Sequence, residues 1–151
     1  MPPLAQSSMV LNSISDWGRV MFEGSCLCGE IRYRVDCDPQ PMGHCHCQTC
    51  RKAHSAAFST VMGVPKTAFS WISGEDQLSG FESSPGKTRS FCRNCGSQLV
   101  ASRDTTDYIL IRVGSIDTEI EARPQVHFWC SDGASWYDPR EELPILPEGV
   151  P

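Results

Sequence analysis

Polar and apolar residues alternate along residues 30–35. Ile31, Tyr33 and Val35 are apolar, and the residue before each of them is charged. A period of two is typical of a strand with one face in a core and the other in water. The pattern therefore predicts a half-buried strand.

Short segments of similar character recur further along the chain. They span residues 58–62, 68–72, 77–82, 87–91, 98–101, 108–113 and 125–129. Gly, Pro, Ser and Asp residues separate several of these segments, as expected of turns. Residues 48–55 contain one β-branched residue, Thr49, and are predicted to form one or two helical turns. The fold predicted is mainly β, with antiparallel sheets.

The two ends of the chain lack a clear strand period. We expect residues 1–21 to form an N-terminal tail that is disordered or loosely packed, and residues 138–151 to be irregular because prolines recur there. A chain of 151 residues with 40% apolar residues can build one core but is short for two. Residues 22–151 are therefore predicted to form a single domain.

The charge balance argues against nucleic acid as a partner. Lys and Arg number 13 against 18 Asp and Glu, a formal net charge of -5, whereas nucleic-acid binders are usually basic. No apolar run reaches the ~18 residues of a membrane span, and residues 1–20 contain no run typical of a signal peptide. The expected location is the cytoplasm, where structural disulfides are disfavoured.

Nine cysteines are the most informative residues of the chain. Seven of them fall into three spaced elements, which are Cys26-x-Cys28, Cys45-x-Cys47-x-x-Cys50 and Cys92-x-x-Cys95. Such spacings bring sulfurs close enough to share one zinc ion at ~2.3 Å. In the last element, Asn94 and Gly96 suit a tight turn because both residue types tolerate positive φ.

The spacing suggests two metal sites of different kinds. Cys26, Cys28, Cys92 and Cys95 can complete a closed structural zinc site, whereas Cys45, Cys47 and Cys50 leave a fourth position open. The first pair could instead complete the central three, and spacing alone does not decide. Reduced buried cysteines and an iron–sulfur cluster are weaker alternatives.

An open site with three thiolates is better suited to binding a further thiol than to activating water, because the thiolates make the ion a weak Lewis acid. A bound thiol loses its proton and becomes a nucleophile for a carbonyl carbon. The alkoxide that forms would need a proton or a positive partner. Nearby candidates are Arg51, Lys52, His46 and His54.

With these residues in view, the chain resembles the glutathione-dependent formaldehyde-activating enzymes, a family that includes the cysteine-rich domain of centromere protein V. The resemblance rests on four segments, which are Gly24–Gly29, His44–Lys52, Phe91–Ser97, and Trp136-Tyr137 with Leu143-Pro144. It implies a β-tent of stacked antiparallel sheets, a fold shared with a Rab guanine-nucleotide-release factor.

The resemblance also implies functions. Cys26, Cys28, Cys92 and Cys95 would hold a structural zinc, and Cys45, Cys47 and Cys50 a catalytic one. Glutathione and formaldehyde would be the substrates, S-(hydroxymethyl)glutathione the product, and the activity that of a carbon–sulfur lyase. Arg51, Lys52, His54 and Trp136 are the candidate substrate contacts.

Other residues have plainer interpretations. His46 and His44 are expected to point away from the neighbouring cysteines, and His127 to be a structural histidine. Cys37, which has acidic neighbours, should have a raised pKa and be inert. Cys130 is expected to be a filler or an exposed loop thiol.

Two functions compete with the lyase hypothesis. A noncatalytic zinc module could bind a protein partner, and would have no open metal position. A thiolate–zinc sensor could lose its metal on oxidation of Cys45, Cys47 and Cys50.

Overall fold

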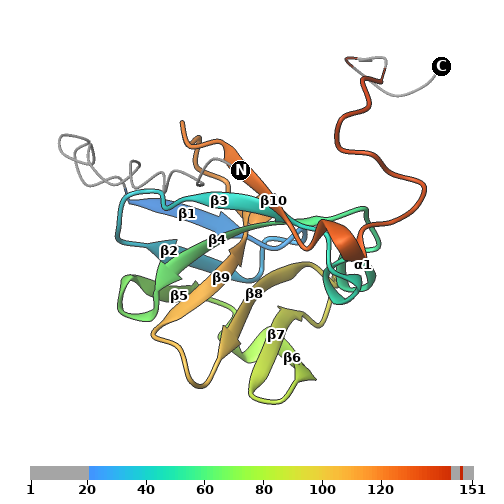
Figure 1. Ribbon diagram of the computed structural model, residues 1–151. Helices are drawn as coiled ribbons and strands as arrows, with labels where there is room; N and C mark the ends of the chain where they lie inside the picture. The colour runs from blue at the N-terminus through green and yellow to red at the C-terminus, as the bar shows by residue number, and fades with distance from the viewer. Residues whose placement is uncertain (1–20, 144–146, 148–151) are drawn as a thin grey trace.

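The computed structural model describes residues 21–143 and residue 147, which form two β-sheets and one short helix (Figure 1). A mainly β fold with stacked sheets is thereby confirmed. The predicted tail lies outside the described residues except for Met21. Residues 138–143 contain no helix or strand, as expected for the part of the C-terminal segment that is described.

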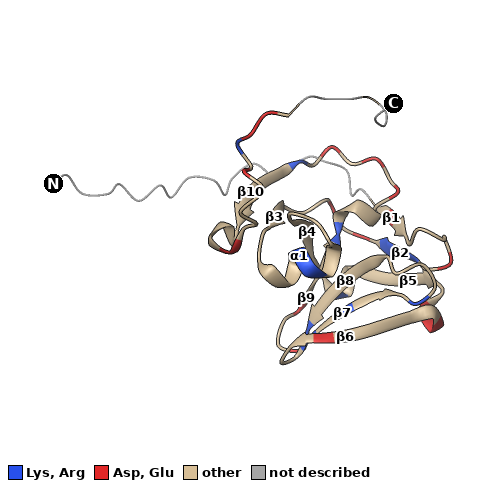
Figure 2. Cartoon of the chain, turned by 90° about the vertical axis from the view of Figure 1, so that its right-hand side faces the viewer, with Lys and Arg blue, Asp and Glu red and all other residues tan. Residues whose placement is uncertain are grey.

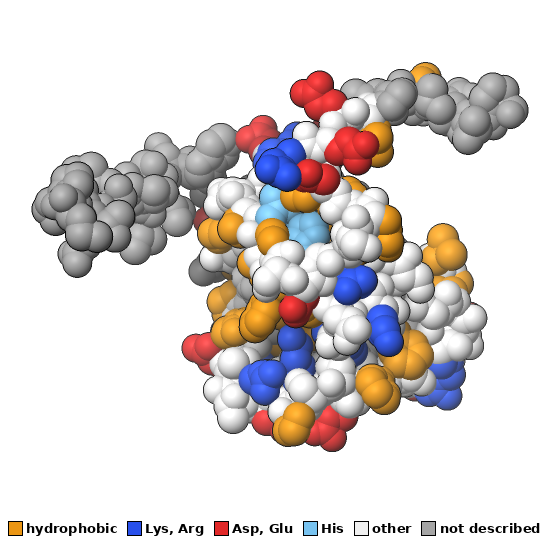
Figure 3. All heavy atoms as spheres, turned by 45° about the vertical axis from the view of Figure 1, so that its right-hand side comes forward, with side chains coloured by type: hydrophobic (Ala, Val, Ile, Leu, Met, Phe, Trp, Pro, Cys, Tyr) orange, Lys and Arg blue, Asp and Glu red, His pale blue; other side chains and the backbone are white. Residues whose placement is uncertain are grey.

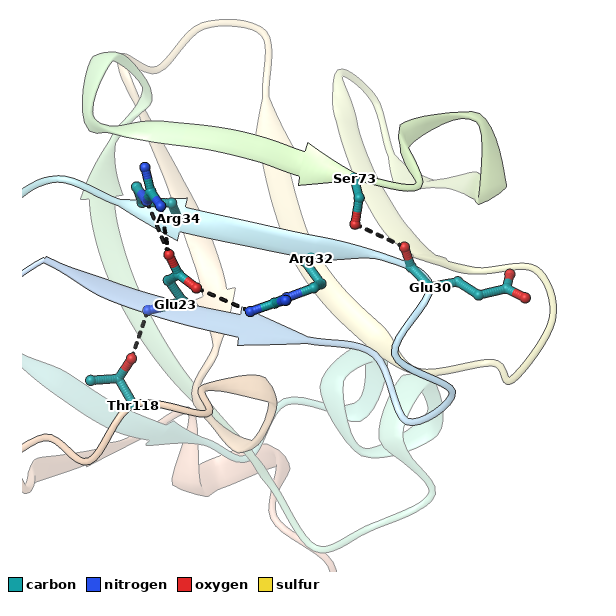
Figure 4. A network of polar contacts seen from close by, with 6 residues as sticks. All are labelled: Glu23, Glu30, Arg32, Arg34, Ser73 and Thr118. Carbon is teal, nitrogen blue, oxygen red and sulfur yellow. Dashed lines mark hydrogen bonds and ion pairs between the residues drawn. The ribbon is translucent and has the colours of Figure 1, made fainter.

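The smaller sheet has three antiparallel strands in the order β1-β2-β5. These are β1 (Phe22–Ser25), β2 (Arg32–Val35) and β5 (Phe69–Ser73). The predicted alternation holds, because Ile31, Tyr33 and Val35 are all fully buried. On the outer face, Glu23 accepts hydrogen bonds from Arg32 and Arg34, and its backbone N–H donates to Thr118 (Figure 4).

The larger sheet has seven strands in the order β10-β3-β4-β9-β8-β7-β6. Their bounds are β3 (Met42–Cys45), β4 (Ser59–Pro65), β6 (Leu78–Ser84), β7 (Lys87–Cys92), β8 (Gln98–Arg103), β9 (Tyr108–Arg112) and β10 (Pro124–Phe128). All neighbours pair antiparallel except β10 and β3, which are parallel. The prediction of antiparallel sheets therefore holds with this one exception.

Each strand predicted from the pattern is present, but β1 and β3 were not predicted. Both are short and contain a glycine, a residue with low β propensity. A Cβ on Gly24 would lie 2.3 Å from the ring of Tyr33, and one on Gly43 would lie 2.8 Å from Val126. Glycine is thus required there by close packing, and the same glycines weaken the strand pattern.

A shared core lies between the two sheets. Its largest fully buried side chains include Phe22, Tyr33, Met62, Leu99 and Ile111, which come from both sheets. Each such side chain contributes roughly 1.5–3 kcal/mol of favourable transfer free energy. The core fixes the sheets against one another and so fixes the strand ends that carry the cysteines.

Helix α1 (Gln48–His54) follows β3 after a two-residue connection and agrees with the predicted range 48–55. Cys47 is its N-cap, and Ser55 ends it in the left-handed conformation with φ 49°. The helix contacts β4 of the large sheet, and Figure 2 shows it in front of that sheet. It therefore covers the sheet at the point where Cys45 ends strand β3.

Candidate metal centres

The four-cysteine cluster, Cys26, Cys28, Cys92 and Cys95, joins the two sheets. Its first two members follow β1 of the small sheet, and its last two lie at the end of β7 and in the turn before β8 of the large sheet. The four sulfur atoms all lie within 4.8 Å of one another. The cluster therefore connects segments 64 residues apart in the chain.

Two tight turns aim the sulfurs of the four-cysteine cluster inward. Gly29 and Gly96 follow the last cysteine of each pair and have φ of +79° and +75°. Their backbone N–H groups donate to the carbonyl oxygens of Cys26 and Cys92 at 2.9 Å. The prediction of positive φ is confirmed for Gly96 but wrong for Asn94, whose side-chain amide instead contacts Glu30.

The three-cysteine cluster, Cys45, Cys47 and Cys50, occupies the junction of β3 and α1. Cys45 is the last residue of β3, Cys47 is the N-cap of α1, and Cys50 lies in the first helical turn. The backbone N–H of Cys50 donates to the sulfur of Cys47 at 3.3 Å. The three sulfurs also lie within 4.8 Å of one another.

The sulfur spacings fit a tetrahedral metal ion. Zn–S bonds of ~2.3 Å imply sulfur atoms about 3.8 Å apart around one zinc. The measured distances are 3.4 Å for Cys26–Cys28, 3.7 Å for Cys28–Cys92 and 3.6 Å for Cys45–Cys47. A disulfide would need about 2.05 Å, and none of the nine cysteines, all of which are described, forms one. Both clusters can therefore hold a metal ion, and the sulfurs are grouped as four and three, while the structural and catalytic roles of the two groups stay predictions.

The thiols of the three-cysteine cluster are strongly coupled. Hydrogen bonding from Cys45, aided by Cys47 and Arg89, lowers the pKa of Cys50 to about 4. The same contact with Cys50, together with burial, raises the pKa of Cys45. Formation of one thiolate is thus favoured, while formation of a second beside it is disfavoured by the repulsion between the two charges. A bound cation would reduce that repulsion.

Two buried arginines lie beside the three-cysteine cluster, and sequence reasoning missed both. Arg89 of β7 and Arg112 of β9 are each 4% exposed. The Nη2 group of Arg89 donates to the sulfur of Cys50 at 3.7 Å, and Nη1 of Arg112 donates to the Ser59 hydroxyl at 3.4 Å. Burial, followed by repulsion from Arg89, lowers the pKa of Arg112 to about 10, so it remains a cation at neutral pH.

Both arginines keep N–H groups without a hydrogen-bond partner among the residues described. These are Nε and Nη1 of Arg89, and Nε and Nη2 of Arg112. The ion pairs found within the described chain involve Arg32, Arg34 and Arg140, and neither buried arginine forms one. A buried cation without a carboxylate partner is costly, which indicates that the thiolates or a ligand compensate its charge.

Two cavities flank helix α1. The larger, about 680 Å³, reaches Cys26 of the four-cysteine cluster and is lined by Ser25, Cys26, Leu27, His54, Ala56, Phe58, Ser59, Thr60, Ser97, Gln98, Arg112, Gly114, Ser115 and Asp117. The smaller, about 500 Å³, is lined by Gln48, Thr49, Lys52, Ala53, Phe81, Ser83, Arg89, Phe91 and Gln98. Both volumes suit a small organic ligand. One of the two buried arginines lines each cavity, Arg112 the larger and Arg89 the smaller.

The four candidate substrate contacts lie in different parts of the structure. His54 lines the larger cavity and Lys52 the smaller one. The guanidinium of Arg51 instead donates to the backbone oxygen of Asp132 at 2.9 Å. Trp136 is 70% exposed and packs edge-on against Tyr137, and it lines neither cavity.

The other histidines form a separate group. His46 is buried, and its Nε2 lies 2.8 Å from Nδ1 of His127, while His44 bonds to Thr60. Figure 3 shows histidine side chains gathered on one face of the molecule. His46 is thus bonded to a histidine of β10 and not to the cysteines beside it.

The remaining two cysteines stand apart from both clusters. Burial, with the charges of Asp38 and Asp36, raises the pKa of the Cys37 thiol, as its acidic neighbours predicted. Cys130 is exposed in a short turn after β10.

Fold and site together define a small, mainly β protein with two cysteine clusters at strand ends. The family model of the glutathione-dependent formaldehyde-activating enzymes matches residues 21–132. The chain therefore belongs to this family, as its cysteine elements suggested. Within the described residues, no helix is long and apolar enough to cross a membrane.

Two curated relatives are similar to the chain. An uncharacterized lyase of Schizosaccharomyces pombe is 32% identical over 78 residues, which are 52% of this chain and 55% of that protein. A putative glutathione-dependent formaldehyde-activating enzyme of Halomonas elongata is 27% identical over 128 residues, 79% of this chain and 81% of that protein. The chain thus spans about half the length of the first relative and most of the second.

A solved structure shares the fold. The crystal structure of a Rhodobacter sphaeroides protein superposes with a TM-score of 0.55 and 17% sequence identity. The match covers 66% of this chain and 91% of that one.

Proposed function

We propose that the chain is a zinc-dependent carbon–sulfur lyase that joins glutathione and formaldehyde, or separates them again. The four-cysteine cluster would hold a structural zinc and the three-cysteine cluster a catalytic one. The observation that carries this proposal is that the second cluster has one sulfur fewer and faces a buried cation, Arg89. The names of the family and of the Halomonas elongata relative support the choice of substrates.

Charge compensation favours a thiolate as the missing group. Three thiolates and one divalent cation carry a net charge of minus one, and Arg89 and Arg112 change this to plus one. An incoming thiolate makes the site neutral, which reduces the cost of burying it. Bound zinc would supply the acidity that deprotonates the thiol near neutral pH.

The reaction needs little further machinery. The thiolate sulfur forms a bond to the carbonyl carbon, and the carbon–oxygen π electrons move to the oxygen. That oxygen then takes up the proton that the thiol released, so atoms and charge balance, and cleavage is the reverse. Arg89 is held against Cys50 and can stabilise the developing negative charge. The sequence had suggested Arg51, Lys52, His46 or His54 for this role.

Exchange NMR of glutathione and formaldehyde tests the proposal. The wild-type protein should accelerate exchange between free and S-hydroxymethylated glutathione above the spontaneous rate. Cys47→Ser is the matched variant, because serine is a good helix N-cap and keeps the cap while removing the sulfur. It should lose the acceleration, and its zinc content should fall from two ions to about one while the fold is kept. Equal exchange with and without wild-type protein would refute the lyase proposal.

A further inference from the structure

The larger cavity contains buried polar atoms that no neighbouring group satisfies. In the described part of the chain, Nε2 of His54, Oε1 of Gln98, and Nε and Nη2 of Arg112 are buried and have no hydrogen-bond partner. All three residues line the 680 Å³ cavity. Since most buried polar groups in proteins are paired, a concentration of unpaired ones in a single cavity indicates a binding site.

The chemistry of these atoms describes the ligand. The two free N–H groups of Arg112 belong to a fixed planar fork, which matches the two oxygens of a carboxylate. The unpaired end of the Gln98 amide can accept an N–H group. Burial, then the charge of Arg112, lowers the pKa of His54 to about 4, so this histidine is neutral and does not compete for the anion.

The walls of the cavity also place the ligand beside the three-cysteine cluster. Ser59, which accepts a hydrogen bond from Arg112, pairs with Cys45 across strands β3 and β4. Asp117 lines the same cavity and offers a negative charge for an ammonium group. A ligand with a carboxylate and an N–H group in this cavity would therefore lie next to the proposed thiol position.

We infer that Arg112 binds a carboxylate of the thiol substrate, and that Gln98 receives an N–H group of the same molecule. Arg112 is thus a specificity residue that selects thiols carrying an amino-acid or peptide carboxylate over neutral thiols. The inference rests on the proposed function for the thiol itself. Arg89, whose guanidinium is engaged with Cys50, remains the cation of the reaction centre.

The test measures binding without turnover. S-methylglutathione keeps the carboxylates of glutathione but has no free thiol, and its diethyl ester lacks the carboxylates. By isothermal titration calorimetry, wild-type protein should bind the acid about tenfold more tightly than the ester. Arg112→Gln should abolish the difference. Arg123→Gln makes the same charge change at an exposed residue whose hydrogen bonds within the described chain go to backbone oxygens, and it should preserve the difference.

Several results would overturn the inference. Equal affinity of wild-type protein for acid and ester would mean that the cavity does not select a carboxylate. Retention of the preference in Arg112→Gln would assign the selection to another residue. If Arg112→Gln does not fold, the inference can be tested on the wild type by NMR of the arginine Nε–H groups. The resonance of Arg112 is assigned as the one that is missing from the spectrum of Arg112→Lys. The Arg112 resonance should shift on addition of S-methylglutathione, and an unchanged resonance would contradict the inference.

The lyase proposal and the carboxylate inference can be refuted independently of each other. Loss of the carboxylate preference with exchange intact would remove the role of Arg112 and leave the lyase proposal standing. Unaccelerated exchange with the preference intact would leave a binding site for acidic peptides in a protein with another activity.

Discussion

The two cysteine clusters offer the same ligand atom, yet their local structures and surroundings differ. The four-cysteine cluster links two sheets and has four sulfurs, and its turns are ordered by glycine. The three-cysteine cluster is local in sequence, has three sulfurs, and lies beside two buried arginines, each of which lines a cavity. A complete set of donors that joins distant segments suits structure, whereas an incomplete set beside unpaired cations suits chemistry.

Removal of a four-cysteine sulfur should have the largest effect. In Cys92→Ser, the cluster that connects β1 and β7 would lose one sulfur and with it the structural metal that we propose, whose binding free energy would be coupled to folding. We expect circular dichroism to show no cooperative thermal unfolding, or a melting temperature lower by tens of degrees. Cys47→Ser should melt close to the wild type. Equal destabilisation by the two substitutions would refute the division of roles.

Removal of the buried cation Arg89 should have the second-largest effect. Arg89→Met removes the donor to Cys50 while keeping much of the side-chain volume. We expect the exchange rate of glutathione and formaldehyde to fall by about ten- to a hundredfold, because charge developing beside the thiolates is no longer stabilised. Arg51→Gln is the control, since Arg51 bonds to the backbone of Asp132 instead. A larger loss in Arg51→Gln than in Arg89→Met would reverse the assignment.

Backbone strain in a knuckle of the four-cysteine cluster should have the smallest effect. Gly96 has φ +75°, and no atom lies within 4 Å of a Cβ placed there. Gly96→Ala therefore adds strain but no clash, and should lower the free energy of unfolding by about 1 kcal/mol. Urea denaturation measures this difference. Gly96→Asn should lower the free energy of unfolding less than Gly96→Ala does, because asparagine tolerates positive φ better than alanine.

The sequence was most informative where local spacing decides the geometry. The cysteine elements predicted both clusters, and the alternation at Ile31, Tyr33 and Val35 predicted its buried face correctly. Strands β1 and β3 were missed because Gly24 and Gly43 are present for close packing with distant residues, which local propensity does not reveal.

The arginines of the site were missed for a related reason. Arg89 and Arg112 lie 39 and 62 residues after Cys50, and only the sheet order brings them to it. The position of Arg112 in the apolar run 108–113 was the one available signal that it is buried. Arg51 was one of the candidates because it follows Cys50 directly, but its guanidinium donates to the backbone oxygen of Asp132.

The parallel pairing of β10 with β3 has a consequence for synthesis on the ribosome. Strand β3, which ends at Cys45, has β4 on one side and β10 on the other, and β10 emerges about 80 residues later. A growing chain therefore exposes the three-cysteine cluster on an open sheet edge until translation reaches Phe128. Because Cys92 and Cys95 precede β10 in the chain, all four cysteines of the four-cysteine cluster have been synthesised before this edge of β3 is covered.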